Sequence, residues 1–216
     1  MLKLALPEAR GGHRVLAVGA HADDLEIGCG GTILRLAGDG LISEAWWVVL
    51  SGDERRAAEA EASASVFLDG IPQPNVLLRH FRDGFFPYSG GEIKEFFEQL
   101  KTEFEPDILF TPRREDLHQD HRIVSELTWN TFRTHLILEY EVPKYDGDLR
   151  SPNVFVDLSE EICRRKVEML RTEFPSQAHR AWFTDDVFWS LLRLRGLESN
   201  ASSGYAEGFH CRKIVL

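Results

Sequence analysis

Short apolar runs alternate with amphipathic segments along most of the chain. Arg14 to Gly19 (RVLAVG) is one such run and predicts a buried strand, whereas apolar residues recur at helical spacing between Ile93 and Phe104. Strands that alternate with helices predict an α/β protein with a mostly parallel sheet, covered by helices on both faces. We expect strands over 14–19, 44–51, 75–78, 107–111, 136–140 and 154–157, and helices over 28–37, 53–67, 93–104, 121–134, 160–174 and 185–197.

This alternation continues without an obvious linker, internal repeat or low-complexity stretch. The length of 216 residues suits one domain, since domains commonly run to about 50–250 residues. We therefore expect a single domain over residues 1–216. Ligands of such sheets bind beyond the carboxyl ends of the strands, so polar residues at those ends are the first candidates for a functional site.

The first polar cluster follows the first predicted strand directly. His21, Asp23 and Asp24 crowd into four residues at the edge where α/β proteins bind ligands. His21 and Asp24 are three apart, so a tight turn can aim both at one ion, and zinc accepts imidazole nitrogen and carboxylate oxygen. Asp23 would then be free to act as a base. The alternative is that these residues cap the following helix and bind nothing.

The second polar cluster follows the strand predicted to end at Thr111. His118 and His121 stand three apart with acidic residues around them, including Asp116 and Asp120. If the two strands are neighbours, both clusters meet at one site, and two such clusters favour a metal centre over two solvated loops. One of the two histidines would complete the ligand set, and the other could donate a hydrogen bond or carry a proton. The spacing alone leaves open which histidine does which.

Composition narrows the class of protein. The net charge of −10 argues against a nucleic-acid partner, because phosphate binding favours basic surfaces. No apolar run approaches the ~18 residues that a membrane-spanning helix needs, and Met1 to Arg10 lacks the pattern of a signal peptide. The three cysteines, an odd and sparse count, indicate a reducing cytoplasmic location and no disulfide framework.

The glycine-rich segment after the first cluster does not indicate nucleotide binding. Gly28, Gly30 and Gly31 do not form the G-x-G-x-x-G pattern, and the carboxylates that precede them would repel a pyrophosphate. We expect no dinucleotide at this turn.

The chain resembles the PIG-L/LmbE-like family, which contains zinc-dependent de-N-acetylases of N-acetylglucosamine conjugates. The specific part of the resemblance lies in three motifs: Ala20-His21-Ala22-Asp23-Asp24, Gly28-Cys29-Gly30-Gly31-Thr32 and His118-Gln119-Asp120-His121. Weaker matches extend it over nearly the whole chain: Arg56 with Glu59, Asp83-Gly84, Lys166 with Ser176-Gln177, and Ala206-Glu207-Gly208-Phe209.

The resemblance implies a Rossmann-like three-layer sandwich and a set of roles for site residues. It implies one zinc ion per chain, bound by His21, Asp24 and His121. Asp23 would be the general base for attack of a zinc-bound water on the amide. It also implies that His118 stabilises the oxyanion or protonates the leaving amine, with Asp120 orienting it.

The same resemblance implies that Arg56, Asp83 and Asp53 contact the sugar. Asp53 stands where the family usually has glutamate, and Ala22 stands where it usually has proline. The loop after the second predicted strand is shorter than the family's, so the substrate cannot be read by analogy. Fe²⁺, Co²⁺ or Ni²⁺ could occupy a similar site, and relatives commonly form homo-oligomers.

The sequence therefore predicts a zinc-dependent hydrolase that removes an acetyl group from the nitrogen of an amino sugar. Two other functions stay open. One is a zinc amidase that acts on another amide, such as a thiol conjugate. The other is a non-catalytic protein of the same fold that binds a sugar or a nucleotide sugar.

Overall fold

A computed structural model describes residues 3–7, 9 and 11–215 of the chain. The strands are β1 (His13–Gly19), β2 (Ile42–Val49), β3 (Gln73–Leu78), β4 (Ile108–Pro112), β5 (Leu136–Tyr140), β6 (Val154–Asp157) and β7 (Ala206–His210). The α-helices are α1 (Asp24–Gly38), α2 (Glu54–Phe67), α3 (Gly90–Glu103), α4 (Gln119–Thr131), α5 (Glu160–Glu173) and α6 (Asp185–Ser199). Two short 3₁₀ turns are η1 (Phe86–Tyr88) and η2 (Pro175–Gln177).

The strands form one sheet in the order β3-β2-β1-β4-β5-β7-β6. The first five of these pair in parallel, whereas β7 runs antiparallel to both β5 and β6. The predicted α/β fold with a mostly parallel sheet is thus confirmed. The chain leaves β1 toward β2 on one side and later adds β4 on the other, so β1 and β4 flank the point where the strand order reverses. Such a point is where open α/β sheets bind ligands.

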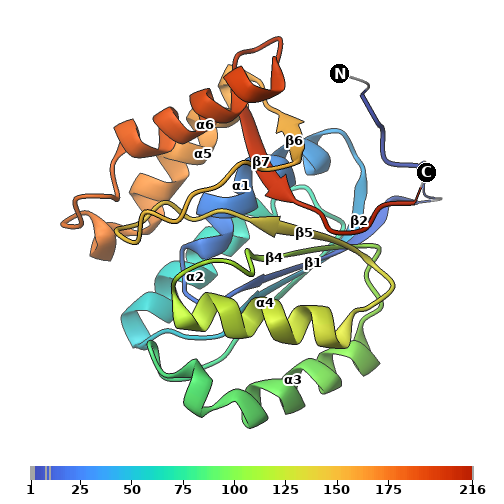
Figure 1. Cartoon of the computed structure of the whole chain (residues 1–216), viewed down its shortest axis with the longest axis vertical. Coiled ribbons are helices and arrows are strands. Elements are labelled where there is room, and N and C mark those ends of the chain that lie inside the picture. The colour runs from blue at the N-terminus through green and yellow to red at the C-terminus, as the bar shows by residue number, and fades with distance from the viewer. Residues whose placement is uncertain (1–2, 8, 10, 216) are drawn as a thin grey trace.

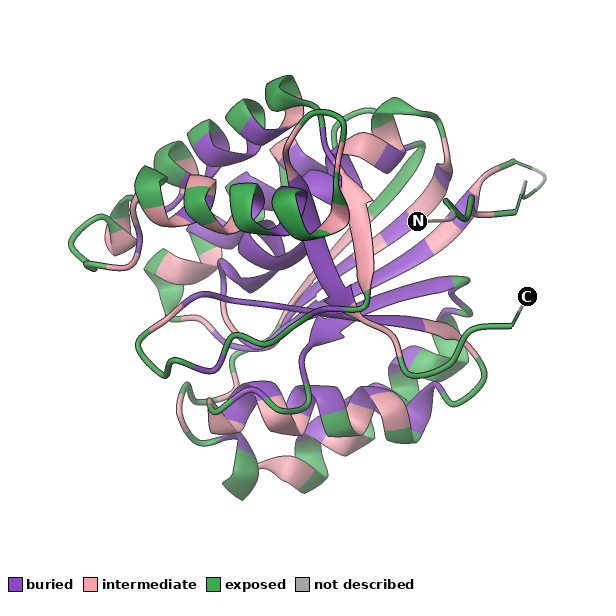
Figure 2. Cartoon of the chain, turned by 45° about the horizontal axis from the view of Figure 1, so that its top comes forward, coloured by how far each residue is buried: buried purple, intermediate pink, exposed green. Residues whose placement is uncertain are grey.

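Helices cover both faces of the sheet and make a three-layer sandwich (Figure 1). Alternate residues of β1 serve the two faces, since Val15 and Ala17 pack into one apolar core and Leu16 and Val18 into the other. Figure 2 shows the buried positions concentrated on the strands and the exposed ones on the outer sides of the helices. Among the described residues, no helix combines the length and the apolar character needed to cross a membrane.

Helix α1 starts at Asp24, four residues before the predicted start, so the glycine-rich segment lies inside the helix. The glycines are there because neighbouring side chains come too close for a Cβ atom. A Cβ atom on Gly28 would lie 2.2 Å from the ring of Tyr140, and one on Gly30 would lie 2.5 Å from the ring of Phe67. Close packing of α1 onto the sheet therefore explains these glycines.

The buried ion pair of Glu207 and Lys166 makes hydrogen bonds with backbone groups in the middle of α1. The carboxylate of Glu207, on β7, accepts the N–H groups of Gly31 (2.8 Å) and Thr32 (2.7 Å). Lys166, on α5, donates to the carbonyl of Ile27 and to Glu207, both at 2.6 Å. Lys166 and Glu207 belong to two of the weaker motif matches. They thus hold the helix that begins at the first polar cluster.

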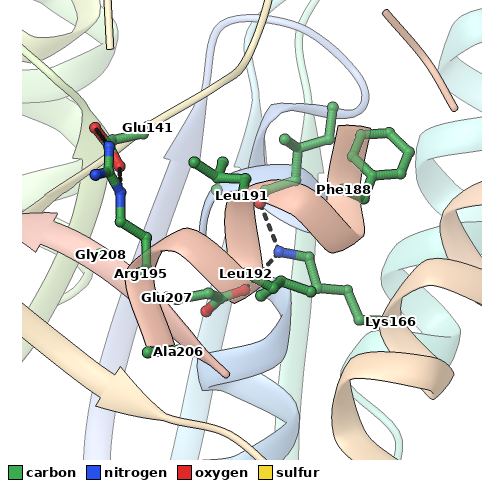
Figure 3. A pocket seen from close by; sticks show the side chains of 11 residues that line it. Glu141, Lys166, Phe188, Leu191, Leu192, Arg195, Ala206, Glu207 and Gly208 are labelled. Atoms are coloured by element: carbon green, nitrogen blue, oxygen red, sulfur yellow. Dashed lines mark hydrogen bonds and ion pairs between the residues drawn. The ribbon is translucent and has the colours of Figure 1, made fainter. Parts of the chain in front are cut away.

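This ion pair borders a cavity of about 20 Å³ between α1, α5, α6 and β7 (Figure 3). A second buried pair, Arg195 with Glu141, lies on its wall at 2.8 Å. The cavity has room for about one water molecule and is too small for a sugar. None of the residues that line it comes from the two polar clusters.

The prediction missed β7 and found the other strands to within two residues at each end. The motif Ala206-Glu207-Gly208-Phe209 lacks an apolar run, because the strand buries a glutamate and approaches Pro152 through a glycine. Local hydrophobicity therefore gave no sign of it.

Candidate metal centre

The two polar clusters meet at the carboxyl ends of β1 and β4, which are neighbours in the sheet. The turn after β1 is held tightly, since Ser51 Oγ donates to the carbonyl of Ala20 (2.8 Å) and Asp24 Oδ2 accepts the N–H of His21 (2.8 Å). Asp23 stands at the N-cap position of α1, but its side chain makes no capping hydrogen bond. Helix capping therefore does not account for this cluster.

Three side-chain atoms from the two clusters form a compact triangle. His121 Nε2 lies 3.2 Å from His21 Nδ1 and 3.2 Å from Asp24 Oδ2, and the latter two atoms lie 3.5 Å apart. Ligand atoms bound at about 2.0–2.1 Å to a tetrahedral zinc ion lie about 3.3–3.4 Å from one another. All three side chains are largely buried. The donor set and its spacing fit a tetrahedral metal ion with one position left over.

His118 lies beside this triangle. One nitrogen of each of His21, His118 and His121 lies within 4.8 Å of the others, so His118 is an alternative ligand. Its Nδ1 accepts the backbone N–H of Asp120 at 3.3 Å, where it acts as the N-cap of α4. The separations of 3.2 Å from His121 Nε2 to Asp24 and to His21 favour His121 as the ligand, whereas Nδ1 of His118 is used by the helix cap.

Asp120 contacts His21, and not His118 as the motif comparison predicts. Its Oδ2 lies 3.3 Å from His21 Nε2 and accepts the N–H of Gly84 at 2.6 Å, while Oδ1 accepts the N–H of Phe86 at 3.1 Å. Only the backbone N–H of Asp120 reaches His118. The predicted orientation of His118 by this carboxylate is therefore wrong. The helix turn points the side chain to the opposite histidine.

Asp116 supports the other histidine and was given no role by sequence. Its Oδ2 lies 2.9 Å from His121 Nδ1 and 2.8 Å from Lys144 Nζ, and Lys144 also contacts Asp148 at 3.0 Å. A carboxylate behind a metal-binding histidine fixes the ring and its tautomer. The sequence could have suggested this role for Asp116, since it stands five residues before His121 in the second polar cluster. Nothing in the sequence signals Lys144, which comes from the loop after β5.

Asp23 keeps one carboxylate oxygen without a partner. Its Oδ1 accepts from Arg56 Nη2 at 2.7 Å, whereas Oδ2 is buried and makes no hydrogen bond within the described part of the chain. Burial raises the pKa of Asp23 despite the nearby guanidinium. A buried carboxylate with a free oxygen and a raised pKa suits a general base.

Arg56 and Asp53 have structural partners in place of the predicted sugar contacts. Arg56 Nη1 donates to Glu59 of α2 (3.0 Å) and to Ser176 of η2 (3.2 Å), so the guanidinium links Asp23 to these two elements. Asp53 caps α2, since its Oδ1 accepts the N–H of Arg56 at 2.8 Å. The weak motif matches around positions 56 and 176 thus meet next to the carboxylate of Asp23. The described contacts of Arg56 and Asp53 give no support for a sugar contact by either of these two residues.

Asp83 stands at the open side of the cluster. Its Oδ1 lies 3.0 Å from His21 Nε2, and 74% of its side chain is exposed. The surrounding loop is fixed, because Asp120 accepts two of its backbone N–H groups and Gln119 Nε2 donates to the carbonyl of Gly84 (3.0 Å). Of the three residues predicted to contact the sugar, Asp83 is the one whose side chain is exposed next to the candidate metal ligands.

Without a metal ion, opposite charges hold the cluster together. Burial lowers the pKa of His121, but the charge of Asp24 and the hydrogen bond that the ring donates to Asp116 outweigh it and raise the value to about 9. Burial likewise opposes ionisation of Asp24, yet His121 and His21 hold the pKa of this carboxyl well below its usual range. The pKa of His118 is lowered, first by burial and then by the other two histidines, so His118 is the neutral ring of the three. A cation in the triangle would replace the protons that these histidines carry.

Comparison with known proteins shows the family of the chain. Residues 16–132, more than half of the chain, match the family described as PIG-L: GlcNAc-PI de-N-acetylase. The chain belongs to this family. The PIG-L match contains both polar clusters and ends just after α4. Membership supports a deacetylase, an enzyme that hydrolyses amide bonds.

Individual relatives of this PIG-L protein are distant. An uncharacterized deacetylase, YaiS of Escherichia coli (strain K12), is 29% identical over 167 residues, which cover 73% of this chain and 88% of YaiS. The structure of N,N'-diacetylchitobiose deacetylase from Pyrococcus horikoshii is similar with a TM-score of 0.71 and 23% identity, over 94% of this chain and 85% of that one.

The same fold also serves another reaction. GalB, the 4-carboxy-2-hydroxymuconate hydratase of Pseudomonas putida KT2440, has a TM-score of 0.72 with 16% identity, over 94% of this chain and 98% of that one. At such identities the structural likeness establishes the fold alone. The reaction of this PIG-L protein must therefore be argued from its own residues.

Proposed function

We propose that this PIG-L protein is a zinc-dependent hydrolase that removes an acetyl group from the nitrogen of an amino sugar or its conjugate. The observation that carries the proposal is the triangle of His21, Asp24 and His121 beside the free buried oxygen of Asp23. The family description and the chitobiose deacetylase support an N-acetylated sugar as the substrate.

One zinc ion per chain fits the triangle, although other divalent transition ions suit the same donors. When bound, zinc supplies a Lewis acid that polarises the amide and lowers the pKa of water toward 7. Asp120 behind His21 and Asp116 behind His121 would fix both rings for this role.

The protein's own groups would move the protons. Asp23 Oδ2 takes the proton of the attacking water, while Arg56 holds the other oxygen and keeps the carboxylate in place. His118 accepts a hydrogen bond at Nδ1, so its neutral ring carries hydrogen on Nε2. That Nε2–H can donate a hydrogen bond to the oxyanion, and the proton that Asp23 has taken can pass to the leaving amine, with acetate as the second product.

We extend the proposal to the setting of the enzyme. Residues 1–216 would act as one deacetylase domain, in the cytoplasm, on a small-molecule substrate and without nucleic acid. The three cysteines are free, as expected in a reducing compartment. Homo-oligomers would be compatible with this role.

Metal analysis is the first test. The protein is purified without added metal, and its metal content is measured for the wild type and for His121→Ala, with exposed His179→Ala as the matched control. We expect about one ion per chain in the wild type and the control, and loss of it in His121→Ala. No metal in the wild type, and none taken up from zinc, would contradict the hydrolase and leave a sugar-binding protein.

A substrate panel then separates the remaining enzymes. Acetate release from N-acetylated amino sugars and their conjugates supports the proposal. Release from other amides, such as thiol conjugates, with no release from amino sugars identifies a zinc amidase of different specificity. The same metal centre would serve both reactions.

A further inference from the structure

The loop after β3 begins with a basic stretch. Arg79, His80 and Arg82 stand within four positions, all three are exposed, and the first acidic residue after them is Asp83. The chain as a whole carries a net charge of −10, so this basic loop differs in sign from the molecule that carries it. Because β3, β2, β1 and β4 pair in parallel, the basic loop lies at the same edge of the sheet as the candidate metal centre.

The guanidinium of Arg82 is stacked on an aromatic ring. Its central carbon lies 3.6 Å from the centroid of the Phe85 ring. The N–H of Phe85 donates to the carbonyl of Arg82 at 3.1 Å, so both residues belong to one tight turn. Stacking covers a flat face of the guanidinium and leaves its N–H donors at the edge free. Arg82 makes no side-chain hydrogen bond and no ion pair within the described residues, so these donors are available to a ligand.

The same turn is fixed beside the candidate metal centre. Asp120 accepts the N–H groups of Gly84 at 2.6 Å and of Phe86 at 3.1 Å. Asp83, the residue after the stacked arginine, has its Oδ1 3.0 Å from His21 Nε2. A turn that is already held in place loses little conformational entropy when a ligand binds to it. The stacked guanidinium is thus a preorganised cation at the edge of the candidate site.

The two opposite charges of this turn face different groups. The carboxylate of Asp83 is turned toward His21, whereas the guanidinium of Arg82 folds over Phe85, and the two side chains form no ion pair with each other. A substrate on the open side of the cluster therefore meets an acceptor first and a cation next to it. Asp83 suits the hydroxyl groups of a sugar, and Arg82 suits a group of negative charge.

Two other cations of the site already have carboxylate partners. Arg56 Nη2 lies 2.7 Å from Asp23 Oδ1, and Lys144 Nζ lies 2.8 Å from Asp116 Oδ2. Arg82 keeps its charge for a ligand. Two parallel N–H donors of a guanidinium match the oxygens of a phosphate or a carboxylate, and such charged pairs are stronger than hydrogen bonds to neutral hydroxyl groups.

We propose that Arg82 binds an anionic group of the substrate, a phosphate or a carboxylate, and thereby determines which N-acetylated amino sugars the enzyme selects. This inference rests on the proposed function, which supplies the amino sugar. The amide lies at the metal centre, the sugar lies beside Asp83, and the anionic group lies next to it at Arg82. The anionic group takes no part in the reaction and is retained in the amino-sugar product.

Competition between charged and neutral substrates tests this specificity. Acetate release is measured from N-acetylglucosamine 1-phosphate, N-acetylglucosamine 6-phosphate and N-acetylmuramic acid, each against neutral N-acetylglucosamine. We expect the wild type to prefer at least one anionic sugar in kcat/KM by about 10–100-fold, the range that a hydrogen bond to a charged group supplies. The preferred sugar distinguishes a phosphate from a carboxylate.

Substitutions of Arg82 assign the preference to this side chain. The ratio of kcat/KM for the anionic and the neutral sugar is compared within each protein, so an effect on the neighbouring Asp83 cancels. In Arg82→Gln the ratio should fall by about 10–100-fold. Arg82→Lys should give an intermediate ratio, because lysine keeps the charge but lacks the planar pair of donors.

Arg79→Gln is the matched control. Arg79 is also exposed, lies over the ring of Phe96 on α3 at 4.4 Å, and forms no ion pair within the described part of the chain. Its variant loses the same charge from the same loop and should keep the wild-type ratio. A fall of the same size in Arg79→Gln would show an effect of total charge and would overturn the assignment to Arg82.

Binding of the corresponding products separates this inference from the proposed function. Calorimetry of the metal-loaded proteins with glucosamine 6-phosphate and glucosamine 1-phosphate needs no turnover, and Arg82→Gln should bind the preferred product about 10–100-fold more weakly. Hydrolysis of neutral and anionic sugars at equal kcat/KM, or a wild-type ratio in Arg82→Gln, overturns the inference and leaves the proposed function standing. Binding that depends on Arg82 without any hydrolysis overturns the proposed function alone. Neither binding nor hydrolysis overturns both.

Discussion

At the residue scale, the candidate base Asp23 differs from the candidate ligands because one of its carboxylate oxygens has no hydrogen-bond partner in the described structure. Asp23→Asn keeps the contact with Arg56 through its amide oxygen but cannot accept a proton. We expect kcat to fall by about 10²–10⁴-fold with little change in zinc content, since general-base catalysis contributes about that factor. Steady-state kinetics and elemental analysis measure both. Turnover near the wild-type rate would remove Asp23 from the base role.

Asp116 gives a second prediction at this scale. Asp116→Asn keeps the size of the side chain but weakens the charged support of His121, so zinc affinity should fall by about 10–100-fold. Competition with a chromophoric chelator measures the affinity, and Asp146→Asn is the control for a lost charge. An unchanged zinc affinity would mean that the ring of His121 needs no carboxylate to hold it.

The ligand residues were predictable, but several of their partners were not. His21 and Asp24 lie within one turn, but spacing left open whether His118 or His121 joins them, and the family resemblance named His121. The direction of the Asp120 side chain and the arrival of Lys144 depend on how the loops run after the strands. The paths of these loops depend on tertiary packing, which short sequence motifs do not indicate.

At the element scale, α1 positions the site because it packs without side chains at its glycines. Gly28→Ala places a methyl group 2.2 Å from the ring of Tyr140, whose hydroxyl is held by the carbonyl of Val18 at 2.9 Å. We expect a loss of about 1–3 kcal/mol in the free energy of unfolding. Gly38→Ala, at an open position on the same helix, should be neutral or stabilise by up to about 1 kcal/mol.

Urea denaturation in the presence of a chelator measures this difference between the two helix variants. Equal stabilities would show that α1 can shift away from Tyr140 at no cost. The same element shows where sequence patterns stop being informative. The glycine-rich segment correctly predicted a helix. The prediction missed its first turn, which starts at Asp24, because that turn contains polar residues of the first cluster.

At the scale of the whole molecule, Glu26 should make stability depend on pH. It is fully buried on α1, and neither carboxylate oxygen has a hydrogen-bond partner in the described structure. Burial raises its pKa to about 8. The folded protein therefore keeps this proton up to about pH 8, whereas the unfolded chain releases it near pH 4–5. Stability contributed by this group is present below that range and is lost as the pH rises through 8.

Glu26→Gln removes this dependence. Between pH 5 and pH 9 the metal-free wild type should lose about 4 kcal/mol of unfolding free energy through this group, and the glutamine variant should not. Chemical denaturation at both pH values checks this. Glu61→Gln, an exposed change on α2, is the control and should follow the wild type. A wild type as stable at pH 9 as at pH 5 would show that Glu26 ionises without cost.

The insertion of Glu207 into α1 has a consequence for the order of events during synthesis. The helix that presents Asp23 and Asp24 leaves the ribosome well before the carboxylate that accepts hydrogen bonds from its middle turn. Until β7 emerges, Lys166 lacks its counter-charge and two backbone N–H groups of α1 lack their acceptor. The nascent chain thus carries every candidate metal ligand before it can hold them rigidly, so under the proposed function we expect metal loading to follow translation.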